Sequence, residues 1–267
     1  MERIHHPEIV PLEVGDLWVD GRLLGGLQDF DDFLRTLRRA IELLRAGQGA
    51  TRSNGPLTRI VAGFDAVFVT GGYSSKKSVE ASLDGMPFPV VFDADGLFGG
   101  ARGGLEWLRE RKVSGWVLDL GKSQLKIITP EKRWAFPCDR QRLSAKAGSP
   151  QEQPQHRRRL REFIALKLQF AMAEAQERPR GLLCALPTKI DAEGTPIGDE
   201  YAGMQDYHLL IPNFLELAGM GGLPIHVLND AELAGLSARL DPRLARFRKV
   251  LVVTLGSGIG AALLLRT

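Results

Sequence analysis

A carboxylate, a glycine turn and a hydroxyl follow one another in the segment Trp116-Val-Leu-Asp-Leu-Gly-Lys-Ser-Gln-Leu-Lys-Ile-Ile128. The apolar residues predict a strand that delivers Asp119 to a tight turn at Gly121–Ser123, and a second strand that leaves it. Backbone N–H groups and the Ser123 hydroxyl in such a turn can approach phosphate oxygens, while the carboxylate faces a hydrated metal ion. The alternative interpretation is an ordinary β-hairpin with a glycine turn, which is the commoner structure for these residues alone.

A second glycine-rich segment spans Val250–Leu265, with glycines at positions 256, 258 and 260. Glycines let a backbone approach an anion closely. A dinucleotide-binding turn of this spacing needs a following helix, a further strand and an acidic residue about twenty positions later. Because the chain ends seven residues after Gly260, we expect a strand–turn–strand hairpin instead.

The segment Leu223–Gly235 predicts a short buried strand that ends at Asn229 and Asp230, where a helix begins. Ligands of open α/β sheets bind at the carboxyl ends of strands, and a carboxylate in that position can accept a proton from an attacking hydroxyl. The alternative is that Asp230 only caps the helix, which is the commoner role for such a residue.

A fourth segment, Ala66–Ser75, predicts a strand that ends in Gly71 and Gly72 before another helix. A flat base or a ribose can lie against a turn of this kind. A strand-to-helix turn that merely needs positive φ explains the two glycines equally well.

The elements that position these residues alternate along the chain. Helical spacing of apolar residues predicts amphipathic helices over residues 30–44 and 160–171. Strands alternating with helices favour an α/β protein. The predicted strands are Glu8–Val14, Ala66–Thr70, Pro89–Phe92, Gly115–Leu120, Leu125–Thr129, Gly181–Leu186, Ile225–Leu228, Lys249–Leu255 and Ala261–Leu265.

Composition narrows the class of protein. A chain of 267 residues can form one large core or two lobes. A net charge of +3 argues against a dedicated nucleic-acid surface, and the two cysteines exclude a disulfide framework and a four-cysteine zinc site. We find neither a signal peptide nor a run of 18 apolar residues, so we expect a cytoplasmic protein without membrane contact. The basic run His156–Arg161 predicts a solvated helix face, with anion binding as the less common alternative.

Together the four segments resemble the superfamily that includes hexokinase, actin and, most similar here, the ROK sugar kinases. The first phosphate motif of that superfamily reads roughly D-x-G-G-T, and carbohydrate kinases often carry D-x-G-K-T. Asp119, Gly121, Lys122 and Ser123 match the latter, with serine in place of threonine.

The other motifs of the family have counterparts elsewhere in the chain. Leu255–Gly260 is similar to the second phosphate motif L-G-T-G-I-G. Asn229–Ala231 and Ala234 match the ROK segment N-D-A-N-x-A-A, whose aspartate is the catalytic base. Gly181–Asp191 resembles the strand and P-G-x-V-D turn of the family, and Thr70–Gly72 resembles its adenosine motif.

The order of these motifs differs from the family. Residues 1–112 resemble its C-terminal portion and residues 113–267 its N-terminal portion. Leu12–Asp16 is similar to the ROK G-E-I-G-H segment, and Gly25–Phe30 to a later G-C-L-E segment. The simplest account is a circular permutation with the new termini in a surface hairpin.

The resemblance thus implies a two-lobed hexokinase/actin-like (ribonuclease H-like) α/β fold, circularly permuted. One lobe, residues 1–112 and 223–267, carries the second phosphate, adenosine and catalytic-base motifs; the other, residues 113–222, carries the first phosphate motif. The permutation also predicts that strand 261–265 pairs with strand 8–14, and that both termini lie on one lobe.

The resemblance further implies an ATP-dependent kinase that uses Mg²⁺ and a small-molecule hydroxyl substrate such as a sugar. It is also compatible with a homodimer. It implies Asp230 as general base; Asn229, Glu13 and Asp16 at the substrate; Asp119 at the metal; Gly121, Lys122, Ser123, Gly256, Ser257 and Gly258 at the phosphates; and Gly71 and Gly72 at the adenosine. The alternatives are a catalytically silent nucleotide-binding regulator or scaffold, which Asp16 and Gln28 in place of the family's His and Glu favour, or another enzyme of the superfamily.

Overall fold

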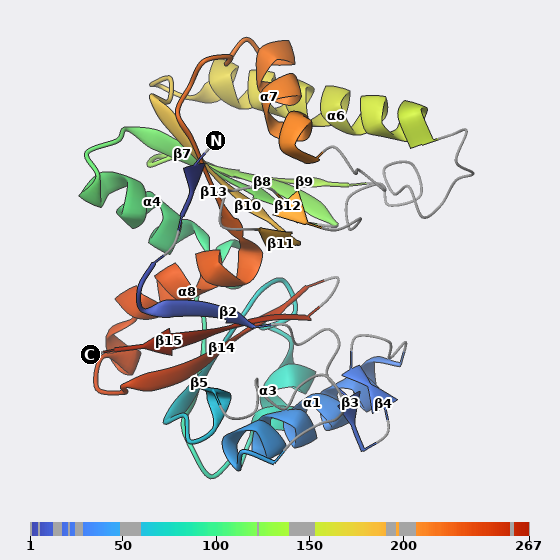
Figure 1. The fold of residues 1–267 in the computed structure, drawn as a ribbon, viewed down its shortest axis with the longest axis vertical. Coiled ribbons are helices and arrows are strands. Elements are labelled where there is room, and N and C mark those ends of the chain that lie inside the picture. Colours follow the sequence, from blue (N-terminus) through green and yellow to red (C-terminus); the bar gives the residue numbers. More distant parts are fainter. Residues whose placement is uncertain are drawn as a thin grey trace. The chain divides into compact units, whose positions relative to one another are not determined.

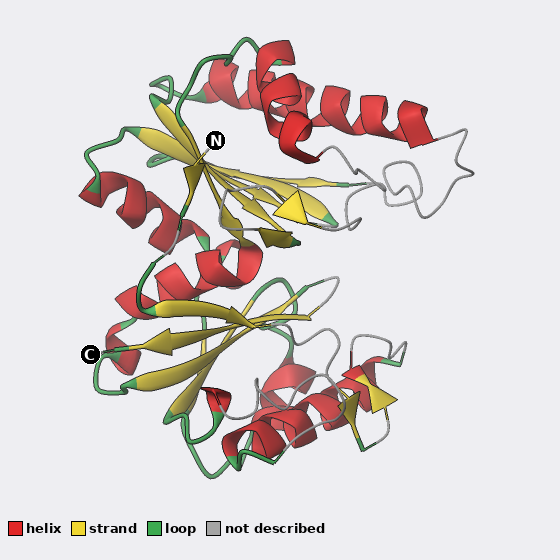
Figure 2. Cartoon of the chain, in the orientation of Figure 1, coloured by secondary structure: helices red, strands yellow, loops and turns green. Residues whose placement is uncertain are grey.

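The structure is a computed structural model, and it forms two compact units (Figure 1). Unit 1 comprises Met1–His5 and Gly104–Asp230, and unit 2 comprises His6–Gly103 and Ala231–Thr267. Each unit combines a mixed sheet with helices, which confirms the predicted α/β class (Figure 2). The structure describes residues 2–4, 6–12, 18–20, 22–24, 29–48, 60–121, 123–138, 153–190, 196–197, 207–256 and 259–266.

The sheet of unit 1 has six strands in the order β1-β13-β10-β7-β8-β9. The strands β7, β8 and β9 form an antiparallel meander, and β10, β13 and β1 continue from β7 in parallel. A separate short hairpin joins β11 (Lys189–Ile190) to β12 (Pro196–Ile197). The sheet strands are β1 (Glu2–Arg3), β7 (Gly115–Leu120), β8 (Gln124–Ile128), β9 (Arg133–Pro137), β10 (Gly181–Leu186) and β13 (Ile225–Asn229).

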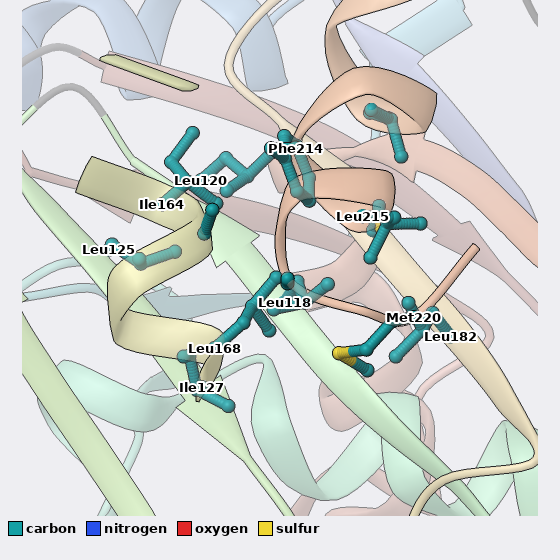
Figure 3. Close-up of a cluster of buried hydrophobic side chains, with 14 of the residues drawn as sticks. Leu118, Leu120, Leu125, Ile127, Ile164, Leu168, Leu182, Phe214, Leu215 and Met220 are labelled. Atoms are coloured by element: carbon teal, nitrogen blue, oxygen red, sulfur yellow. The ribbon is translucent and has the colours of Figure 1, made fainter. Parts of the chain in front are cut away.

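Helices α6 (Gln153–Glu174) and α7 (Tyr207–Leu217) cover one face of this sheet, and α4 (Ala101–Glu110) lies on the other (Figure 1). The side chains of α6 that point to the sheet recur every three or four residues, as in an amphipathic helix. They meet strand and α7 side chains in one core (Figure 3). Burial of each such side chain contributes about 1.5–3 kcal/mol. The core includes Leu118, Leu120, Leu125, Ile127, Leu160, Ile164, Leu168, Leu182 and Phe214.

The sheet of unit 2 has five strands in the order β2-β15-β14-β5-β6. Here β14, β15 and β2 are antiparallel, and β5 and β6 continue from β14 in parallel. A two-stranded sheet of β3 (Trp18–Val19) and β4 (Arg22–Leu23) is separate. The sheet strands are β2 (Ile9–Leu12), β5 (Ala66–Thr70), β6 (Val90–Phe92), β14 (Lys249–Leu255) and β15 (Ile259–Leu265).

Helices α1 (Phe30–Arg45) and α3 (Lys77–Leu83) cover one face of this sheet, and α8 (Asp230–Leu240) covers the other (Figure 1). The Asp29 side chain caps α1 by accepting a hydrogen bond from Asp32 N at 2.8 Å. Residues 231–238 of α8 are all buried, and a Cβ on Gly235 would lie 2.7 Å from a methyl of Ile9. Two short 3₁₀ helices complete the unit, η2 (Gly96–Phe98) and η4 (Pro242–Leu244).

The two sheets repeat one topology. In unit 1 it runs β9-β8-β7-β10-β13, and in unit 2 it runs β2-β15-β14-β5-β6: three antiparallel strands, then two parallel ones. In unit 1 the meander is continuous in sequence. In unit 2 its third strand, β2, comes from the opposite end of the chain to β14 and β15.

The predicted pairing of the 261–265 strand with the 8–14 strand is confirmed, since Ala261 pairs with Leu12 in an antiparallel ladder. At the far end of this ladder, Leu265 N donates to Glu8 O at 2.7 Å. The prediction that both termini lie on one lobe is wrong at the N-terminal end. Strand β1 pairs with β13 of unit 1, where it supplies partners to a backbone edge that would otherwise be exposed.

The observed units also differ from the predicted lobes at their boundaries. The prediction grouped residues 223–230 with the second phosphate and adenosine motifs, but β13 pairs with β10 and belongs to unit 1. Residues 104–112 belong to unit 1 as well, because the division between the units falls within α4, after Gly103. No helix in the described residues has the length and apolar character needed to cross a membrane.

Candidate functional site

Asp119 lies near the end of β7, and its side chain is only 15% exposed. Its direct cross-strand partner on β8 is Lys126, whose Nζ donates to Asp119 Oδ2 at 2.7 Å. The Lys126 side chain is also 15% exposed, so two opposite charges are largely removed from water together. Sequence reasoning missed Lys126, although the alternation of β8 places it on the opposite face from Leu125 and Ile127.

Asp119 offers one carboxylate to a magnesium ion, which fits an ion that is carried by a ligand. Lys126 occupies Oδ2, and Oδ1 accepts no hydrogen bond from any residue that the structure describes. Within those described ranges, no group of three or more His, Cys, Asp and Glu side chains is placed to hold a metal. Magnesium is usually bound through one or two carboxylates together with substrate phosphates and water. A single carboxylate such as Asp119 therefore suits a Mg²⁺–phosphate complex.

The turn after Asp119 is tight. A Cβ on Gly121 would lie 2.9 Å from Gln124 O, so a side chain at this position would displace the start of β8. The backbone of Ser123 is held by the next strand, because Ser123 O accepts from Cys138 N at 2.8 Å. Lys122, the third predicted residue of this turn, lies outside the described residues.

Asn229 ends β13, and Asp230 opens α8 immediately after it. The Asn229 side chain is oriented by the end of the neighbouring strand, since its Nδ2 donates to Thr188 O at 2.8 Å and to Leu186 O at 3.4 Å. Asp230 is half-buried at the first turn of the helix, where the helix dipole favours a negative charge.

The structure brings Asp119, Asn229 and Asp230 to one edge of the unit 1 sheet. Strands β7, β10 and β13 are parallel, with Asp119 beside Ala185 and Leu186 beside Asn229. Two strand spacings, about 10 Å, separate β7 from β13. This is the carboxyl edge of the sheet, where α/β proteins bind ligands.

The segment that resembles the adenosine motif, at Gly71, lies next to the start of the segment that resembles the second phosphate motif, at Leu255, within unit 2. Gly71 follows β5 with φ +98°, and a Cβ there would overlap the Leu255 carbonyl oxygen. The backbone of Tyr73 donates to Leu255 O at 3.0 Å. A Cβ on Gly256 would meet nothing within 4 Å, so the space beside this exposed glycine is open.

Four other predicted site residues lie outside the described residues: Ser257, Gly258, Glu13 and Asp16.

Replacement of Gly71 by alanine is expected to destabilise unit 2 by at least about 2 kcal/mol, from backbone strain and overlap with Leu255. The matched control is Gly85→Ala, because Gly85 also has positive φ (+68°) but no atom within 4 Å of an added Cβ. The control should lose about 1 kcal/mol. Urea unfolding of the three proteins measures both values, and equal losses would show that the contact with Leu255 carries no constraint.

A polar cluster follows β6 close to Gly71. Thr70 Oγ1 donates to Asp93 Oδ2 at 2.9 Å, and Asp95 N donates to Asp93 Oδ1 at 3.0 Å. Partial burial raises the pKa of Asp93 above its ordinary value, against the lowering effect of these hydrogen bonds. A Cβ on Gly99 would overlap both Thr70 and Asp93, so the glycine lets the loop pack onto this pair.

The two cysteines are poor candidates for nucleophilic chemistry. Burial raises the pKa of Cys138 to about 11 and raises the pKa of the fully buried Cys184 further still. Neither sulfur is a thiolate at neutral pH, and the thiolate is the reactive form.

The basic run on α6 contributes to a mixed-charge pocket instead of a uniform anion site. The pocket has a volume of 540 Å³ and lies between α6 and α7. Arg158 already pairs with Glu162 at 2.7 Å on the same helix, which fits the solvated-face interpretation. The pocket is lined by Arg158, Arg161, Glu162, Asn213, Glu216 and Leu217.

Comparison of the chain with protein-family models, with curated proteins and with solved structures gave no match.

Proposed function

We propose that this protein is a cytoplasmic ATP-dependent phosphotransferase that transfers the γ-phosphoryl group to a hydroxyl of a sugar or similar small molecule. One observation carries the proposal: Asp119 and Asn229–Asp230, from distant parts of the sequence, lie at the same carboxyl edge of the unit 1 sheet. A second pair of predicted segments, at Gly71 and Leu255, is in direct contact in unit 2.

We also propose a circularly permuted, two-lobed hexokinase/actin-like fold. The repeated sheet topology of the two units supports it, since such a fold places one sheet in each lobe. The pairing of β15 with β2 supports the permutation, because Leu265 and Glu8 are hydrogen-bonded neighbours as in a continuous hairpin. In this account the residues before Glu8 extend beyond the join, and β1 adds a strand to the sheet of unit 1.

The proposed reaction assigns one group of residues to the metal ion and the phosphates of ATP. Lys126 fixes the orientation of the Asp119 carboxylate, and Asp119 would hold the magnesium ion of Mg²⁺-ATP through water. The ion supplies neutralisation of charge on the transferring phosphoryl group. Gly121 and Ser123 of unit 1 and Gly256 of unit 2 are proposed phosphate residues, as are Lys122, Ser257 and Gly258.

At the acceptor, Asp230 takes the proton of the attacking hydroxyl at its carboxylate. Asn229 is proposed to help hold the acceptor, and the bond from its Nδ2 to Thr188 O, just after β10, fixes the orientation of its amide. Glu13 and Asp16 remain proposed substrate residues, and Gly71 and Gly72 adjoin the adenosine. Phosphoryl transfer depends mainly on positioning and charge neutralisation, which these groups provide.

A nucleotide-binding regulator without turnover is the second candidate. The ion pair of Asp119 with Lys126 favours it, because the lysine already neutralises the carboxylate that would otherwise attract a metal. Asp16 and Gln28, which depart from the family pattern, favour it as well.

Binding of ATP and transfer of its γ-phosphate test the proposal separately. We expect ATP to raise the melting temperature only when Mg²⁺ is present, and γ-labelled ATP to label at least one acceptor in a panel of sugars and polyols. Binding without transfer to any acceptor would favour the regulator. No stabilisation by any nucleotide would remove both candidates.

A further inference from the structure

An exposed aromatic residue directly follows the glycine pair of the adenosine-like segment in unit 2. Tyr73 is 37% exposed and adjoins Gly72, which is exposed as well. The ring of Phe30 lies 5.5 Å from that of Tyr73, between centroids. Lys76 Nζ lies 4.1 Å from the Tyr73 centroid and 4.9 Å from the Phe30 centroid. The three side chains form an aromatic–cation cluster beside the turn.

The backbone of Tyr73 is fixed to the same strand end that carries the second glycine turn. Its N–H donates to Leu255 O at 3.0 Å, and Gly71 packs against Leu255 too closely for any side chain. The attraction of the Lys76 ammonium group for both rings adds to this positioning. The ring of Tyr73 is therefore held in place without being buried.

The polar groups of the turn are largely used within it. Ser74 N donates to Gly71 O at 3.0 Å, and Ser74 Oγ donates to the same oxygen at 2.7 Å. Lys76 N donates to Tyr73 O at 3.1 Å. A base beside this turn meets an exposed glycine and an aromatic ring more readily than free donors and acceptors. Such a surface suits stacking more than recognition of the base edge.

We propose that Tyr73, supported by Phe30 and Lys76, is the stacking platform for the base of the bound nucleotide, and that it accepts purines without distinguishing adenine from guanine. This inference rests on the proposed nucleotide binding. Every base has a π-face, so stacking tolerates a change of base. ATP and GTP should therefore bind with dissociation constants within about threefold of each other, and the smaller ring of CTP should bind more weakly.

Calorimetry with Mg²⁺ and three ligands, ATP, GTP and inorganic tripolyphosphate, tests the platform. Loss of a stacked aromatic side chain weakens binding about tenfold or more. Tyr73→Ala should therefore weaken both nucleotides about tenfold while the affinity for tripolyphosphate stays unchanged. Tyr73→Trp should restore nucleotide affinity, because it restores a ring. The control is Phe170→Ala, which removes a 47% exposed ring in unit 1 and should change none of the three affinities.

One further variant keeps the outcome clear. Tyr73→Leu retains apolar bulk at this position, so weak nucleotide binding by a folded Tyr73→Leu protein supports stacking over packing. Nucleotide affinity of Tyr73→Ala equal to wild type would overturn the platform and leave the proposed function intact. ATP bound more than about thirtyfold tighter than GTP would show that the base edge is read. A wild-type protein that binds tripolyphosphate but neither nucleotide would overturn both proposals.

Discussion

Asp230→Asn is expected to lower the rate of phosphoryl transfer at least about a hundredfold while ATP binds almost normally. A positioned general base contributes about 10²–10⁴ in rate, and an amide cannot accept a proton at neutral pH. The phosphates are assigned to other residues, at the turns around Gly121 and Gly256, so nucleotide affinity should change little. Single-turnover transfer from labelled ATP, with melting temperature measured on the same protein, gives both values.

The competing role for Asp230 is structural, at the first turn of α8. Asparagine caps helices about as well as aspartate, so a purely capping residue would tolerate this change. Asp29→Asn is the matched control, because Asp29 caps α1 with its side chain and has no proposed part in the reaction. Both variants should remain folded, and only Asp230→Asn should lose transfer. Near-wild-type turnover by Asp230→Asn would refute its assignment as the base.

Four strands have the bounds that the sequence predicts: Ala66–Thr70, Gly115–Leu120, Gly181–Leu186 and Lys249–Leu255. Each is a nearly continuous apolar run, as expected for strands buried on both faces of a parallel sheet. The strand Arg133–Pro137 was missed because its apolar run is short and ends in a proline, which weakens a strand prediction.

In the site, features that depend on nearby residues could be predicted from the sequence, and contacts between distant segments could not. A local pattern identifies Asp119 and Asp230, because each lies where an apolar strand ends. The contact between Gly71 and Leu255 depends on the parallel pairing of β5 with β14, which no sequence spacing encodes. The partnership of Asp119 with Lys126 depends on the hairpin register, and a shift of one residue would turn the lysine to the other face.

The repeated topology of the two sheets could not be predicted from the sequence either. The two sheets share a strand order but no periodic sequence pattern, since different apolar residues fill equivalent strands equally well. The motif order pointed to the pairing of β2 with β15, yet not to the separate position of β1. Two residues are too short a strand to leave a recognisable pattern.

Asp119→Asn is expected to remove the magnesium dependence of ATP binding. In the wild-type protein, Mg²⁺ should strengthen ATP binding, because Asp119 would hold, through water, the ion that the phosphates carry. Loss of a charge-assisted contact of this kind costs about ten- to a hundredfold in affinity. Without magnesium the same substitution should strengthen ATP binding, because a carboxylate near the phosphates is gone and Lys126 has lost its anionic partner. Calorimetry with Mg²⁺ and with EDTA measures the two effects.

The opposite signs distinguish a metal-binding role from a general loss of structure. Removal of one partner from a largely buried ion pair destabilises a protein by about 3 kcal/mol, so Asp119→Asn alone could unfold unit 1. The double variant Asp119→Asn/Lys126→Met has no unpaired charge, and it should be more stable than the single variant in urea unfolding. It should also lack the magnesium dependence, and it should lose the gain in EDTA because the lysine is absent. If magnesium strengthens ATP binding equally in wild type and in the folded double variant, Asp119 does not hold the ion, and the carboxylate serves only to pair with Lys126.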